Sequence, residues 1–182
     1  MPAQLVTVPS VELIHTGTWD ISTGQWTVTT ETLESAVAAH IAGVVRRPVL
    51  KLGHDDPRFD GQPAVGYLDN LRVTADGQTL IGDYVGVPQW LADVLASAYP
   101  TRSVEGVHDV VAVDGTRYPF VLTATALLGV TDPGISTLAD IPAYFGVAAK
   151  AVAVTVTATE TPATAMAVAL ASARRARRAR GK

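Results

Sequence analysis

The chain has 182 residues, of which 48% are hydrophobic and 17% charged, and it contains no cysteine. This composition predicts one globular domain and excludes a disordered polymer, a disulfide scaffold, thiolate metal sites and cysteine nucleophiles. The formal net charge is −3, but residues 174–182 hold six of the 14 basic side chains and no acidic one. The preceding residues are therefore acidic, at −9, and the last nine are basic, at +6.

The first predicted elements are short strands followed by a helix. Residues 11–17 are typical of a strand, and residues 19–26 of two short strands around a turn. Thr29 or Thr30 can cap the helix that follows, in which Leu33, Val37 and Ile41 form one apolar stripe.

Further along, strands alternate with polar turns and one more helix. A strand at 49–52 runs directly into a polar turn at 53–57. Two Asp-Gly turns predict β-hairpins, and Pro88 suits the first position of a second helix that Tyr99 and Pro100 end. The hairpin strands are predicted at residues 64–74 with 79–85, and at 103–113 with 116–130.

These elements predict a mainly β fold of the α+β class. We expect about seven strands, mostly linked antiparallel, in a β-barrel or curled sheet with helices around it. Residues 1–146 are predicted to form this body. Residues 147–182 contain no aromatic side chain and are rich in Ala, Val and Thr, so they are predicted to form a linker and a basic tail, either helical or disordered.

Four histidines are available as bases: His15, His40, His54 and His108. His40 is expected to cover the surface of the first helix, and His15 to lie within a strand. His54 differs, because it follows a buried strand in a turn that also holds Asp55 and Asp56. Loops at strand ends are where catalytic groups tend to be displayed, whereas a lone histidine in a turn is most often only a surface residue.

Ser103 is the candidate nucleophile. It lies at the start of a strand that follows a helix, between a basic and an acidic neighbour. A serine hydroxyl needs a base to take its proton and donors for the oxyanion, which Arg102 or a backbone N–H could supply. The alternative is an ordinary serine on a strand edge.

Four short segments occur in an order that resembles the capsid maturation (prohead) proteases of tailed phages, especially the type related to the protease of phage Mu. The similarity extends over about residues 11–144. The segments are LKLGHD (50–55), PAVGYL (63–68), RSVEG (102–106) and ALLGVTDPGI (126–135).

The resemblance implies a serine endopeptidase with a herpesvirus assemblin-like fold, which is a β-barrel surrounded by helices. Ser103 would be the nucleophile and His54 its general base. Related proteases often carry an acid before the last segment, and residues 123–126 here have none. Besides the two aspartates beside His54, the third member could be Glu105 or His108. Glu105 ranks first, because strand alternation places it on the face of Ser103.

The resemblance also implies partners and a location. The substrates would be phage scaffolding and major capsid proteins, and the chain itself, within the procapsid in the host cytoplasm. The tail would dock on acidic capsid or scaffold surfaces, and a homo-oligomer is left open. The alternatives for the tail are nonspecific binding of nucleic acid through its phosphates and a solvated end with no partner. No cofactor, metal, membrane span, signal peptide or specific nucleic-acid partner is expected. The alternative function is an inactive scaffold or minor head protein with the same fold.

Overall fold

The computed structural model describes residues 4–54, 62–129, 133–139 and 141, and these residues form two helices and eight strands. The tail predicted at 147–182 lies outside them. In chain order the elements are β1 (Leu5–His15), β2 (Gly17–Ile21), β3 (Gly24–Val28), α1 (Thr30–Ala42), β4 (Val49–Leu52), β5 (Gly66–Val73), β6 (Thr79–Pro88), α2 (Gln89–Ala98), β7 (Thr101–Val111) and β8 (Arg117–Leu128).

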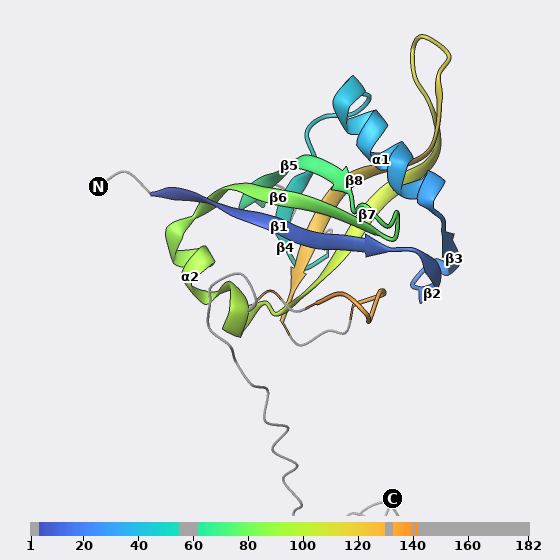
Figure 1. Ribbon diagram of the computed structural model, residues 1–182. Helices are drawn as coiled ribbons and strands as arrows, with labels where there is room; N and C mark the ends of the chain where they lie inside the picture. Colours follow the sequence, from blue (N-terminus) through green and yellow to red (C-terminus); the bar gives the residue numbers. More distant parts are fainter. Residues whose placement is uncertain (1–3, 55–61, 130–132, 140, 142–182) are drawn as a thin grey trace, which may run out of the picture. The chain divides into compact units, whose positions relative to one another are not determined.

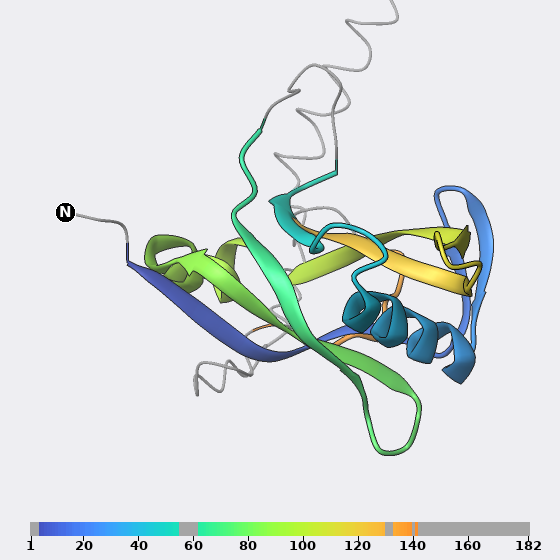
Figure 2. The same ribbon diagram turned by 90° about the horizontal axis from the view of Figure 1, so that it is seen from above.

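Six of the strands form one mixed sheet in the order β1-β6-β5-β4-β8-β7, and β2 pairs with β3 in a separate hairpin (Figures 1 and 2). All neighbouring pairs are antiparallel except β4 with β8, which are parallel. The sheet is curled so that its two edge strands, β1 and β7, contact each other. The described strands therefore form a curled, mixed sheet with two edges, which is one of the two expected arrangements, and they do not close into the antiparallel β-barrel that was the other.

Both helices form where the sequence predicts them, at opposite ends of the sheet (Figure 1). Thr29 caps α1 by accepting a hydrogen bond from the Thr32 amide, and Gly43 ends the helix in the left-handed region with φ of 63°. The predicted apolar stripe is only partly correct. Leu33 is fully buried, but Ile41 is 79% exposed, because α1 contacts β8 and β5 through Leu33, Ala36 and Ala39.

The hydrophobic core of the described residues lies inside the curl of the sheet. Leucines from β1, α1, β4, β6 and α2 meet there with no exposed surface, namely Leu13, Leu33, Leu50, Leu80 and Leu95. Full burial of one such side chain stabilises the fold by about 1.5–3 kcal/mol. The core fixes the relative positions of β4, β8 and β7, which carry the residues considered below.

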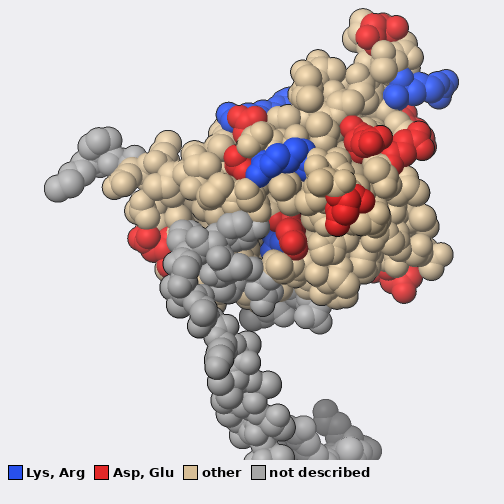
Figure 3. All heavy atoms as spheres, in the orientation of Figure 1, with Lys and Arg blue, Asp and Glu red and all other residues tan. Residues whose placement is uncertain are grey.

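Charged side chains are scattered over the face shown in Figure 3, with acidic and basic groups interspersed. Of the helices in the described part of the chain, neither has the length and apolar character that crossing a membrane requires.

Candidate functional site

Ser103 lies on the edge strand β7, in a row of side chains that crosses three strands. It pairs with Ala126 of β8, and Ala126 pairs in turn with Lys51 of β4. Paired residues on adjacent strands point to the same face of a sheet. Ser103 and Lys51 therefore share one face, with only the methyl group of Ala126 between them.

Glu105 lies on the same face two residues further along β7. Its partner on β8 is Ala124, which is as small as Ala126. Because β8 presents only methyl groups here, long side chains from β4 and β7 can meet above it. Lys51 Nζ lies 2.7 Å from Glu105 Oε2 in an ion pair that joins the two strands.

His54 reaches the same carboxylate from the end of β4. Its Nδ1 lies 2.8 Å from Glu105 Oε1. Glu105 and Val49 both pair with Ala124, so Glu105 lies beside the start of β4. A straight continuation of β4 beyond Leu52 would therefore carry His54 away from Glu105. Gly53 prevents this, since its φ of 67° turns the chain while its N–H still donates to the Leu127 carbonyl at 2.9 Å.

The arrangement leaves one ring nitrogen of His54 for chemistry. With Nδ1–H donating to the Glu105 carboxylate, the ring takes the tautomer in which Nε2 carries a lone pair. This is the orientation that a carboxylate gives to the general base of a serine hydrolase. Among the described residues no hydrogen bond joins Ser103 to His54, and the His54 side chain is 53% exposed.

Ser103, His54 and Glu105 all line one cavity of about 1100 Å³. This volume is slightly larger than the range of about 300–1,000 Å³ that is typical of ligand pockets in proteins. Many of the other lining residues are apolar or aromatic and come from β1, the β2–β3 hairpin, β8 and residues 133–138. They include Leu13, Ile21, Trp26, Phe120, Ile135 and Leu138.

His108, the alternative third member, lies apart from the His54–Glu105 pair. A β-bulge does lie between Glu105 and Gly106, but β8 supplies its extra residue, so β7 keeps its alternation. The His108 ring accordingly packs against Trp26 and Phe120, with centroids 5.8 and 5.2 Å away. His108 lines another part of the cavity and does not contact Glu105.

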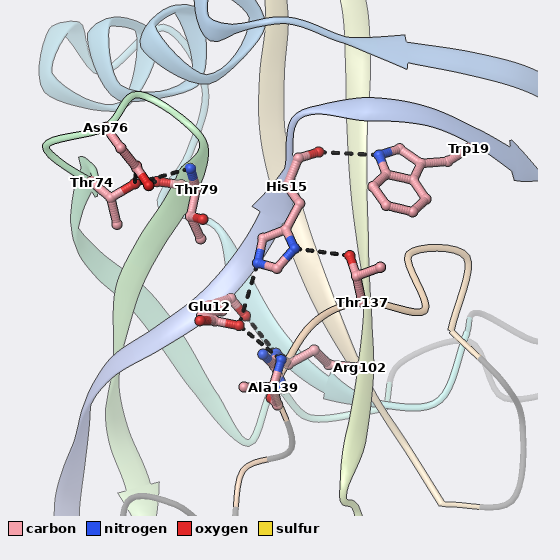
Figure 4. Close-up of polar contacts among 9 residues, drawn as sticks. All are labelled: Glu12, His15, Trp19, Thr74, Asp76, Thr79, Arg102, Thr137 and Ala139. Carbon is pink, nitrogen blue, oxygen red and sulfur yellow. Dashed lines mark hydrogen bonds and ion pairs between the residues drawn. The ribbon is translucent and has the colours of Figure 1, made fainter.

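Arg102, the candidate oxyanion donor, is 2% exposed and points to the opposite face of β7 from Ser103. Its Nε donates to the Glu12 carbonyl of β1 at 2.5 Å, and its Nη1 donates to the Ala139 carbonyl at 2.8 Å (Figure 4). The third nitrogen, Nη2, is buried and has no hydrogen-bond partner among the described residues, and Arg102 is one of the residues that line the cavity. Through Nε and Nη1 the guanidinium therefore ties the edge strand β7 to β1 and to the segment at residue 139.

The other predicted residues lie elsewhere or outside the described part of the chain. His15 Nδ1 is 2.9 Å from Thr137 Oγ1 (Figure 4), and His40 Nε2 is 3.3 Å from Asp69 Oδ1. Asp55 and Asp56 are not among the described residues. Within those residues no group of three or more His, Asp or Glu side chains is placed to hold a metal ion.

Lys51 is the site residue that the sequence analysis missed. The signal was present, because a lysine between two leucines in a strand predicted to be buried needs a partner for its charge. Its side chain is only 14% exposed. The partner could not be identified from spacing, since Glu105 is on a strand that pairs with β4 only through β8.

We compared the chain with protein-family models, curated proteins and solved structures, and none of these comparisons gives a significant match.

Proposed function

We propose that the chain is a serine endopeptidase in which Ser103 is the nucleophile, His54 the general base and Glu105 the group that orients His54. The observation that carries the proposal is the 2.8 Å contact between His54 Nδ1 and Glu105 Oε1, at the rim of a cavity that Ser103 also lines. Two elements far apart in the chain are needed to make this contact. A surface histidine would need no such partner.

The chemistry follows from these positions. As Ser103 Oγ attacks a peptide carbonyl, His54 Nε2 takes the hydroxyl proton, and the Glu105 carboxylate stabilises the imidazolium that forms. His54 then protonates the leaving amine, and water hydrolyses the acyl-enzyme by the same route. The exposed His54 ring must move to within about 3 Å of Ser103 Oγ for this transfer, and hydrogen bonds of this kind are often long before substrate binds.

The cavity supports a peptide as the substrate. The apolar part of its lining would take a large apolar side chain near the cleaved bond, while the polar rim with Ser103 faces the backbone. The resemblance of the four sequence segments suggests phage scaffolding and capsid proteins, cleaved within the procapsid. A curled, mainly β sheet whose edges contact each other is compatible with the proposed assemblin-like fold.

The test is mass spectrometry of the purified chain, incubated alone and with co-expressed capsid and scaffold proteins. Wild type should yield defined fragments and Ser103→Ala none. Ser22→Ala is the matched control, because Ser22 lines the same cavity but belongs to the β2–β3 turn. Cleavage that continues in a folded Ser103→Ala protein would refute the proposal.

The second candidate is an inactive head protein that has kept the protease fold. The missing hydrogen bond between Ser103 and His54 in the described residues favours it. A fluorophosphonate probe separates the two functions, since it reacts only with an activated serine. Labelling of wild type but not of His54→Ala supports the enzyme, and equal lack of labelling in both supports the inactive protein.

A further inference from the structure

Lys51 and His54 each contact one oxygen of the Glu105 carboxylate. Lys51 Nζ lies 2.7 Å from Glu105 Oε2, and His54 Nδ1 lies 2.8 Å from Glu105 Oε1. The two donors come from the middle and the end of the same short strand, and Glu105 comes from β7. The plane of the carboxylate is thus fixed by a separate contact on each oxygen.

Nothing else in the described residues is shown to hold this carboxylate. The Glu105 backbone carbonyl accepts from Thr123 Oγ1 at 3.1 Å, but that bond fixes the strand and not the side chain. Ala124 and Ala126 lie beneath the side chain and are too small to restrict its rotamers. Among the contacts given for the described residues, Glu105 without Lys51 would be held only by His54, whose side chain is 53% exposed.

Burial makes the contact with Lys51 stronger than an ordinary surface ion pair. The side chains are 14% exposed for Lys51 and 29% for Glu105, whereas exposed pairs contribute little. The 2.7 Å separation of Lys51 Nζ and Glu105 Oε2 is in the range of charge-assisted hydrogen bonds, which are shorter and stronger than neutral ones. The ammonium therefore can hold Glu105 in one orientation.

We propose that Lys51 is a positioning residue of the site. It holds the Glu105 carboxylate so that Oε1 receives the Nδ1 proton of His54, which keeps the lone pair on Nε2 and directs it toward Ser103. This inference rests on the proposed protease function, but its effect on His54 can be measured without activity. The alternative is that the ion pair only joins β4 to β7.

The experiment compares Lys51→Met, which keeps the length of the stem and removes the charge, with Lys51→Arg, which keeps the charge. Arg72→Met is the matched control, because it breaks an ion pair with Asp83 at 3.2 Å between β5 and β6. Each folded variant is assayed for kcat and KM on the fragment-yielding substrate. The tautomer of His54 is read from the side-chain nitrogen shifts of ¹⁵N-histidine-labelled protein.

We expect Lys51→Met to lower kcat by about tenfold and to change KM by less than about twofold. The tenfold figure is the low end of the loss seen when a metal-bound histidine loses the residue that its other ring nitrogen hydrogen-bonds. The His54 tautomer should become mixed. Lys51→Arg should restore most of kcat and the single tautomer, and Arg72→Met should leave both unchanged.

Two outcomes overturn the inference. Lys51→Met with wild-type kcat and an unchanged tautomer would show that the ion pair only joins the strands. A fall in kcat that Arg72→Met reproduces would show a general loss of stability. If wild type cleaves nothing, the protease proposal fails, yet the His54 tautomer in Lys51→Met still tests the contact.

Discussion

His54 Nδ1 and Glu105 Oε1 lie 2.8 Å apart although 51 positions separate them in the chain. The contact requires β4 and β7 to lie on either side of β8, one parallel and one antiparallel to it. It also requires the left-handed turn at Gly53. Each of these features can be tested through its effect on cleavage.

Replacing Glu105 with glutamine should abolish most of the activity and leave the fold intact. An amide that presents N–H to His54 favours the tautomer with the lone pair on Nδ1, so Nε2 cannot act as a base. The corresponding change in a serine protease triad lowers kcat by about 10⁴, and we expect a fall of roughly 10²–10⁴ here. Steady-state kinetics would measure it.

His108→Gln is the control for Glu105→Gln, since both residues are on β7 and line the same cavity. His108 packs against Phe120 and Trp26 and not against His54. We expect its kcat within about threefold of wild type, because loss of an aromatic contact costs only about 0.5–1.5 kcal/mol. A larger loss in His108→Gln than in Glu105→Gln would identify His108 as the third member.

Gly53→Ala should reduce both stability and activity. A Cβ at this position meets no atom of the described residues within 4 Å, so the cost there is that of the φ of 67°, about 1–2 kcal/mol. Relief of that strain would turn His54 away from Glu105 and lower kcat. Chemical denaturation and kinetics on the same sample separate the two effects.

Gly43→Ala provides the matched comparison for Gly53→Ala. Gly43 has φ of 63° and equally open surroundings, but it ends α1. The Gly43→Ala substitution should lower the free energy of unfolding by a similar amount, while kcat stays at the wild-type value. Equal activity in the two variants would mean that the turn at Gly53 does not position His54.

The local elements could be predicted from the sequence, and so could the position of Glu105 on the same face of its strand as Ser103. Capping by Thr29, both Asp-Gly turns and strand alternation depend on neighbouring residues, and the structure has all of them where they were predicted. Alternation also placed His108 on the other face of β7, and the bulge does not change this because β8 carries the extra residue.

What could not be predicted depends on contacts between distant segments. Ile41 fits the helical period as well as Leu33 does, but only the position of α1 against β8 and β5 decides that Ile41 is exposed. The partner of Lys51 and the parallel pairing of β4 with β8 need the order of strands in the sheet. The buried role of Arg102 needs the curl that brings β1 to β7.

Arg102→Met should destabilise the fold more than it impairs the chemistry. The substitution leaves the Glu12 and Ala139 carbonyls without their donors, at a cost of about 1–3 kcal/mol each before water replaces them. We expect a lower midpoint of urea unfolding, with kcat per folded molecule within a few-fold of wild type. Full stability with abolished cleavage would instead support Arg102 as the oxyanion donor.

Asp83 should make the fold sensitive to acid at a place distant from Ser103. Burial raises its pKa, but hydrogen bonds from the Ser10 amide at 2.8 Å and Asn70 Nδ2 at 2.9 Å, with the Arg72 charge, outweigh burial, so the pKa is lowered overall. A lowered pKa in the folded state means that this stabilisation is complete above the ordinary pKa of aspartate, about 4, and is lost as the pH falls through the folded-state value.

Asp83→Asn should therefore be less stable than wild type at pH 7 by about 1.5–3 kcal/mol, the contribution of a hydrogen bond to a charged group. The difference should shrink as the pH falls below 4, because the wild-type carboxyl is then protonated too. Urea unfolding at a series of pH values measures this, with Glu34→Gln on the exposed face of α1 as the control for net charge. A difference that stays constant down to pH 2 would show that the Asp83 charge does not stabilise the junction of β1, β5 and β6.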